Sequence, residues 1–318
     1  MSIMVQMREL ARLGRQGEAV ALVAQSAEAG DGEACFVLAN WRLWGLYGLR
    51  DLEACHLLLE RAASASFNEA ARLRAYLVAN GTGGSADFAQ GVALLQAIAS
   101  VDENARTQIA MLEEMPLPEE VGGLERETLS PDPSITLIRG LLTPNECGYL
   151  IAQAAPMLRP SLVVDPITRR SRPDPTRTSS GMNFDPSTED LVVNAINRRL
   201  AAVTASPFEC GENLSILRYE PGQEYVPHVD ALPAVANQRH ITALVYLNED
   251  YTGGETSFVS LGIEVKGSVG DCLIFHNSGA DGRPDMRTRH AGQPVTSGVK
   301  WLASRWIRQM PYDRFATG

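Results

Sequence analysis

The sequence predicts a multidomain protein, with an all-α solenoid of helix-turn-helix repeats followed by an antiparallel barrel or jelly roll with flanking helices. Three observations lead to this fold class. The first hundred residues are rich in Ala and Leu and almost free of proline, which favours helix. A Pro- and Glu-rich stretch follows, and beyond it short β-branched runs alternate with Gly and Pro turns. The length of 318 residues also favours two domains over one.

The N-terminal residues 1–115 contain an internal repeat. Shifting the sequence by 36 positions places Gly45 on Gly81 and Asp51 on Asp87, and it also aligns several Ala and Leu positions. A period in the mid-thirties with helical content is typical of an α-solenoid. The region resembles Sel1-like repeats, which are related to tetratricopeptide repeats. Two interpretations stay open: a concave surface that holds a protein partner, or a scaffold that packs against its neighbour.

The charge, the apolar runs and the cysteines of the sequence limit which partners and which cellular compartment we expect. The net charge of −10 and the pI of about 5.1 disfavour nucleic acid and anionic lipid as bulk partners. No apolar run is long enough to cross a membrane, and the start lacks the apolar core of a signal peptide. The five cysteines are scattered without metal-site spacing, so we expect reduced cysteines in a cytoplasmic protein.

The boundary between the domains is expected at a linker spanning 116–133, with the second domain at 134–318. The linker contains four prolines, and proline disfavours helix and stiffens such segments. After it, Thr143 and Pro144 predict a helix start, and 187–204 predicts a second helix. The polar, Arg-rich stretch 165–181 predicts an exposed loop.

A candidate metal site comes from His228, Asp230 and His290. On an extended backbone His228 and Asp230 lie on the same face, so both can bind one ion. His290, 62 positions after His228, is the candidate third ligand, although His276 competes with it. Two histidines and one carboxylate form the facial triad of non-haem Fe(II) oxygenases.

Lys300, ten residues after His290, strengthens this interpretation. A 2-oxoglutarate co-substrate chelates iron through its ketoacid end, and its other carboxylate then needs a buried cation. A buried lysine without such a partner would be costly. Taken alone, Lys300 beside Gly298 would be interpreted as a surface residue, and the metal-ligating residues in register change that interpretation.

An ordered set of motifs surrounds these residues, and it resembles the catalytic domain of prolyl 4-hydroxylases. The motifs are 217–223 (LRYEPGQ), 228–230 (HVD), 242–248 (TALVYLN), 253–256 (GGET), 270–275 (GDCLIF), 290–295 (HAGQPV) and 298–301 (GVKW). The resemblance covers about residues 134–312 and implies a double-stranded β-helix, or jelly roll. It also implies oxidative decarboxylation of 2-oxoglutarate to succinate and CO2, coupled to hydroxylation of a carbon by O2.

The family's roles carry over by position. His228, Asp230 and His290 match the iron ligands, and Lys300 matches the residue that pairs with 2-oxoglutarate. Tyr219 matches the tyrosine that hydrogen-bonds the same co-substrate. By analogy Tyr246 and Thr256 line its pocket, with a core role as the alternative for all three. The resemblance thus implies Fe(II), 2-oxoglutarate and O2, with ascorbate as a further candidate cofactor.

The substrate is less constrained than the chemistry. The resemblance and the solenoid favour a proline in a peptide or protein, with a free amino acid or small metabolite as the alternative. The loop 165–181 is the expected lid, since its Arg177-Thr178-Ser179-Ser180 run resembles one in the family. His276 departs from the aromatic residue usual there, and it either faces the substrate or caps its strand.

Two rival functions remain at this point. One is a metal-dependent hydrolase or isomerase that binds zinc on the same barrel, which leaves Lys300 unexplained. The other is an inactive binding module, although degeneration usually removes a ligand and none is missing here.

Overall fold

The computed structural model describes residues 2–116, 118–164, 171–173, 176–279 and 281–315. The chain divides into two compact units, Met1–Glu114 with Pro186–Asn194, and Met115–Asp185 with Ala195–Gly318. Among the described residues, the helices are too short or too polar to traverse a bilayer.

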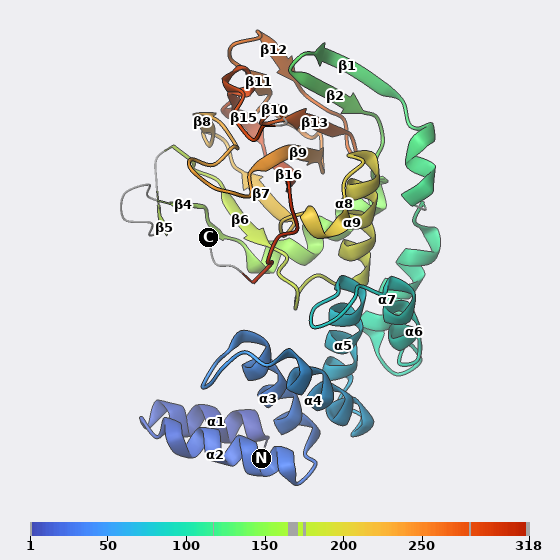
Figure 1. Ribbon diagram of the computed structural model, residues 1–318, viewed down its shortest axis with the longest axis vertical. Helices are drawn as coiled ribbons and strands as arrows, with labels where there is room; N and C mark the ends of the chain where they lie inside the picture. The colour runs from blue at the N-terminus through green and yellow to red at the C-terminus, as the bar shows by residue number, and fades with distance from the viewer. Residues whose placement is uncertain (1, 117, 165–170, 174–175, 280, 316–318) are drawn as a thin grey trace. The chain divides into compact units, whose positions relative to one another are not determined.

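The first unit is built from successive antiparallel helices (Figure 1). They are α1 (Ile3–Arg12), α2 (Gln16–Glu28), α3 (Gly32–Trp44), α4 (Leu52–Ser64), α5 (Asn68–Asn80), α6 (Phe88–Gln96) and α7 (Glu103–Glu114). The side chains of Asp51 and Asp87 cap α4 and α6 by accepting backbone hydrogen bonds. Gly45 and Gly81 end α3 and α5 in the left-handed conformation, which glycine adopts without strain. Equivalent residues of the 36-residue shift therefore play equivalent parts in the helices.

The second unit contains two main antiparallel sheets (Figure 1). The larger sheet has the order β1 (Arg126–Pro131), β2 (Ser134–Ile138), β13 (Cys272–His276), β9 (Arg239–Tyr246), β16 (Lys300–Arg308), β7 (Ser215–Tyr219), β6 (Ser180–Asn183) and β3 (Arg159–Pro160). The smaller has the order β12 (Ile263–Val265), β11 (Thr256–Phe258), β14 (His290–Gly292) and β8 (Tyr225–His228). Two short ribbons, β10 (Tyr251–Gly253) with β15 (Val295–Gly298) and β4 (Leu162–Val164) with β5 (Ser171–Pro173), complete the strands among the described residues.

The two sheets share one apolar core. Leu244 and Leu302 of the larger sheet belong to the same buried cluster as Phe258 and Val265 of the smaller sheet. Because side chains alternate along a strand, every second residue of β9 and β16 faces this core. The helices followed by an antiparallel sheet domain confirm the coarse order of the predicted class, and the paired sheets are those of a jelly roll. The solenoid arrangement of the helices stays a prediction.

Two flanking helices of the predicted kind accompany the sheets. Helix α8 (Pro144–Ala154) begins with the expected cap, since Thr143 and Glu146 form a capping box. Helix α9 (Leu191–Val203) begins later than the predicted 187, and from Ala195 on it belongs to the second unit. Within that unit Arg199 donates two hydrogen bonds to the buried Glu146 carboxylate, at 2.5 and 3.0 Å.

Two expectations differ from the structure or fall outside it. The stretch 116–133, expected as linker, contains the 3-10 helix Pro118–Gly123 and strand β1. Pro131 is the last residue of β1, where a missing amide does not interrupt the pairing with β2. The expected lid 165–181 lies partly outside the described residues, and Ser180 and Gly181 belong to β6.

Candidate metal centre and active site

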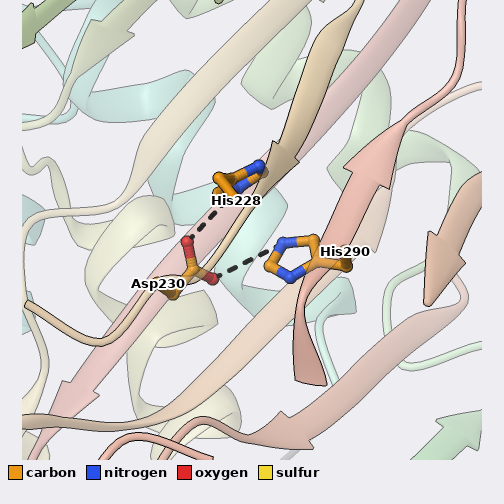
Figure 2. Close-up of side chains that lie close together, drawn as sticks. All are labelled: His228, Asp230 and His290. Carbon is orange, nitrogen blue, oxygen red and sulfur yellow. Dashed lines mark ion pairs between the residues drawn. The ribbon is translucent and has the colours of Figure 1, made fainter. Parts of the chain in front are cut away.

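Two neighbouring residues, His228 and Asp230, meet the distant His290 at one end of the smaller sheet. His228 ends β8 and His290 begins β14, and the two are direct partners in the antiparallel register. Asp230 follows two residues after His228, with Oδ1 at 3.6 Å from His228 Nε2 and Oδ2 at 3.8 Å from His290 Nε2. Figure 2 shows the carboxylate between the two imidazoles. All three offer a ligand atom within 4.8 Å of the others, so they could hold one metal ion.

Hydrogen bonds set the orientation of both imidazoles. His228 Nδ1 lies 3.0 Å from the carbonyl oxygen of Val226, and His290 Nδ1 lies 3.0 Å from that of Thr288. A carbonyl only accepts, so each Nδ1 carries a proton, and Nε2 is the ring nitrogen left for a metal. Each Nε2 lies on the side of the carboxylate, which is the arrangement that a metal ligand needs.

Burial sets the charge of the site. Burial raises the pKa of Asp230, but the neighbouring histidines and a hydrogen bond from Thr242 lower it by more, so the carboxylate is ionised. Burial lowers the pKa of His290 to about 4, further than Asp230 can raise it. At neutral pH the site therefore offers an anionic carboxylate and an unprotonated His290, as metal binding requires.

Lys300 lies at the start of β16, opposite Tyr219 in the register. It is only 2% exposed, and its ammonium donates to the carbonyl oxygen of Gly254 at 2.7 Å. Burial lowers the pKa of Lys300 to about 8, although Glu255 raises it in part. No carboxylate in the described part of the chain forms an ion pair with it, so the buried cation lacks a direct counter-charge.

One cavity connects the metal-ligating cluster with Lys300. Its walls include His228, Asp230, His290 and Lys300, and the remaining lining is mostly apolar or aromatic. The other lining residues are Arg177, Leu217, Tyr219, Tyr225, Leu244, Thr256, Gly292, Leu302, Ser304 and Trp306. A cavity with a metal site at one end and a cation at the other suits a small dianion.

The other predicted residues divide into two groups. Tyr219 and Thr256 line the cavity. Burial raises the pKa of Tyr219, so its hydroxyl remains protonated at neutral pH. Tyr246 does not line the cavity. Its side chain is buried, its hydroxyl donates to Thr256 Oγ1 at 3.1 Å, and Lys300 Nζ lies 5.7 Å from its ring centroid, so its predicted place beside the co-substrate stays a prediction.

The remaining histidines lie away from the cavity. His276 ends β13, where its ring centroid is 5.1 Å from that of His240, and it is not among the residues that line the cavity. His240 is the second residue of β9, and its Nδ1 lies 3.1 Å from Ser278 Oγ. His56 lies in α4, with Nε2 2.7 Å from the carbonyl oxygen of Thr82.

Several residues of this site were not predicted. Tyr225 stacks on His228 with ring centroids 3.5 Å apart, and Trp306 lines the cavity from the end of β16. Thr242 donates to Asp230, and Asn277 donates to Thr242. Alternation along β16 from Lys300 could have indicated Trp306, but no sequence signal links Asn277 to Asp230.

Comparison with known proteins decides the family. A family model described as 2OG-Fe(II) oxygenase superfamily matches residues 214–308. Prolyl 4-hydroxylase 1 of Arabidopsis thaliana is 38% identical over 208 residues, which cover 59% of this chain and 74% of the relative. The chain belongs to the prolyl 4-hydroxylase family. Probable prolyl 4-hydroxylase 6 of the same plant is also 38% identical, over 58% of this chain and 73% of its own length.

Among solved structures, a viral collagen prolyl hydroxylase from Paramecium Bursaria Chlorella virus-1, in its 2OG complex, is 30% identical. It has a TM-score of 0.45 and covers 55% of this chain and 96% of its own.

Membership in the prolyl 4-hydroxylase family establishes the chemistry. The chain is a 2-oxoglutarate-dependent dioxygenase that uses Fe(II), 2-oxoglutarate and O2, and the predicted activity and cofactors are thereby confirmed. The residues present fit these groups, because two imidazoles and a carboxylate suit non-haem iron and an uncompensated buried ammonium suits a carboxylate. The zinc hydrolase and the inactive module are correspondingly disfavoured.

Proposed function

We propose that this dioxygenase hydroxylates a proline in a peptide or protein, with His228, Asp230 and His290 as the iron ligands. The single observation that carries the ligand assignment is the convergence of these three donors within 4.8 Å. The Nδ1 hydrogen bonds leave both Nε2 atoms available, and Asp230 is ionised. Bound Fe(II) and 2-oxoglutarate supply the activation of O2, while the protein positions the reactants.

Lys300 is proposed to bind the distal carboxylate of 2-oxoglutarate. Its ammonium is buried, and within the described residues its hydrogen-bond partner is the neutral Gly254 carbonyl alone. A carboxylate there would form a charge-assisted hydrogen bond and offset the cost of the buried charge. Thr256 and Tyr219 line the same cavity and can donate to the co-substrate, whereas Tyr246 acts through Thr256.

The assignment of a prolyl substrate rests on family membership and on the form of the cavity. The relatives are named for prolyl 4-hydroxylation. Tyr225 and Trp306 provide aromatic walls, and a proline ring packs well on such surfaces. Arg177, whose guanidinium lies 5.1 Å from the Tyr225 ring centroid, can donate to a peptide carbonyl.

The test follows succinate and hydroxyproline together. Anaerobically purified protein is loaded with Fe(II) and 2-oxoglutarate, O2 is admitted, and proline-containing peptides are compared with matched peptides carrying alanine. Succinate that depends on iron, on His228 and on one class of proline peptide supports the proposal. Succinate without any hydroxylated peptide would redirect the search to a free amino acid or small metabolite. No succinate, together with no 2-oxoglutarate binding, would overturn the assignment of the site.

The N-terminal helices are proposed to form a Sel1-like solenoid over 1–115 that receives a protein partner or substrate. The support is the spacing: α3 starts at Gly32 and α5 at Asn68, and α4 starts at Leu52 and α6 at Phe88, each pair 36 positions apart. A variant lacking 1–115 that still hydroxylates short peptides but loses activity on a full-length protein substrate would support this role. Equal loss on both would contradict it.

A cytoplasmic location is proposed from the cysteines, with 134–318 as the oxygenase domain. All five cysteines are free and buried, which suits a reducing compartment. Fractionation of the native cell with an antibody to the chain tests this, and recovery with an extracytoplasmic fraction would refute it.

A further inference from the structure

A chain of hydrogen bonds leads from Asp230 into the interior of the larger sheet. Thr242, on β9, donates its hydroxyl proton to Asp230 Oδ2 at 2.7 Å. Asn277, just after β13, donates from Nδ2 to Thr242 Oγ1 at 2.7 Å. Thr242 is 0% exposed and Asn277 is 2% exposed, so water does not compete for these bonds.

The direction of this chain is fixed by chemistry. An ionised Asp230 can only accept, so the single proton of the Thr242 hydroxyl must point to it. The lone pairs of Thr242 Oγ1 then face Asn277, which must present its amide NH2 rather than its carbonyl oxygen. Asn277 thereby holds the hydroxyl in the one orientation that serves Asp230, and the carboxylate oxygen Oδ1 stays available on the side of His228.

The main chain of Asn277 reaches a second member of the cluster. Its carbonyl oxygen accepts from the amide of Asp285 at 2.9 Å. Asp285 opens the 3-10 turn Met286–Thr288, and the Thr288 amide and hydroxyl both bond back to the Asp285 carbonyl. The Thr288 carbonyl in turn accepts from Nδ1 of His290 at 3.0 Å. One residue thus supports the orienting groups of both Asp230 and His290.

One polar atom of Asn277 lowers the stability of the fold, so the asparagine is not explained by stability. Its Oδ1 is buried and has no hydrogen-bond partner in the described part of the chain. Leaving such an acceptor unpaired destabilises the folded state, and an apolar residue of similar size would avoid this. An amide at this position is therefore better explained by its donor.

We propose that Asn277 and Thr242 are positioning residues for the metal centre, with the Asn277 side chain aligning Asp230 through Thr242, while its main-chain carbonyl holds the turn that precedes His290. The inference rests on the proposed ligand set, and it predicts a particular pattern of metal affinity. Outer partners of metal ligands typically change affinity by about 10–100-fold when they are removed.

The test measures binding of Co(II), as an air-stable probe, by its visible spectrum, and of Fe(II) under anaerobic conditions, in the full chain without 2-oxoglutarate. Thr242→Val keeps the shape and removes the donor, and we expect its metal dissociation constant to rise by about 10–100-fold. Asn277→Leu keeps Thr242 and leaves its hydroxyl free to turn, so a smaller rise is expected, together with a changed Co(II) spectrum. Thr242→Ser keeps the hydroxyl, and its affinity for metal should stay close to that of the wild type.

The double variant Thr242→Val with Asn277→Leu separates positioning from general damage. If Asn277 acts on Asp230 through Thr242, the double variant binds metal about as weakly as Thr242→Val alone. If the two substitutions instead reduced metal affinity independently, so that their fold-losses multiplied, Asn277 would not act through Thr242. Lowered unfolding midpoints with unchanged metal affinity would also contradict the positioning role. If Thr242→Val does not fold, Asn277→Leu and Thr242→Ser still decide the question.

Failure of the positioning role can be told apart from failure of the ligand set. Wild-type protein that binds neither Co(II) nor Fe(II) would refute the proposed ligands. Wild-type binding with equal affinity in every variant would refute only the role of Thr242 and Asn277.

Discussion

The two ends of the active-site cavity handle buried charge in opposite ways. At the metal end, Asp230 is ionised and accepts from Thr242 while two imidazoles face it. At the other end, Lys300 has a neutral carbonyl as partner and a pKa lowered to about 8. The metal end is organised before any ligand arrives, whereas the cation end is left uncompensated until an anion binds. The co-substrate should therefore gain much of its affinity at Lys300.

The largest effect is expected at the metal end, from Asp230→Asn. The change keeps the shape but removes the charge, so we expect 2-oxoglutarate turnover to fall by more than the ~100-fold typical of outer partners. Succinate formation at saturating Fe(II) measures this loss. Asp250→Asn, at an exposed carboxylate, is the matched control and should leave turnover unchanged. Retained turnover in Asp230→Asn would remove this residue from the ligand set.

Lys300→Met probes the cation end alone. We expect affinity for 2-oxoglutarate to fall by about 100-fold, because the partner of a buried carboxylate is lost. Titration of 2-oxoglutarate into the Co(II)-loaded protein measures this, with Co(II) affinity itself unchanged. The thermal midpoint of the ligand-free variant should rise, since an uncompensated buried ammonium is removed. A fall in both midpoint and Co(II) affinity would mean that the two ends are not independent.

The pH dependence of co-substrate affinity sharpens the same comparison. Because the pKa of Lys300 is about 8 in the free protein, the ammonium is present below that pH and is lost above it. Affinity for 2-oxoglutarate should be level below about pH 8 and should then fall by up to about tenfold per pH unit. Calorimetric titration between pH 6.5 and 9.5 measures the slope, and Lys300→Met should abolish it. A flat profile in the wild type would show that Lys300 does not pair with the co-substrate.

Sequence and structure agree best where local rules act. His-x-Asp on an extended backbone requires both side chains on one face, and the structure places His228 and Asp230 together. The cap at Thr143 is a local pattern of the same kind. The antiparallel sheet domain follows from the spacing of short β-branched runs and turns.

The features that were missed depend on tertiary pairing. Strand β1 contains Pro131 and polar residues, and its pairing with β2 makes it a strand. The link from Asn277 through Thr242 to Asp230 needs β13 and β9 to be neighbours in a known register, which the sequence does not encode locally. The place of Tyr246 beside the co-substrate stays a prediction: its hydroxyl donates to Thr256 Oγ1, and Lys300 Nζ lies 5.7 Å from its ring centroid.

The smallest effect is expected from His276→Phe, which restores an aromatic residue usual in the family. His276 ends β13 outside the cavity lining, and its ring packs near His240 at 5.1 Å. Burial and the neighbouring His240 lower the pKa of His276, so the variant removes no charge at neutral pH. Turnover and the KM for the preferred peptide should stay within about twofold, as for substitutions away from special features. A tenfold change in KM with unchanged succinate formation in the absence of peptide would instead place His276 in the path of the substrate. The larger sheet would then contribute to substrate selection beyond the two ends of the cavity.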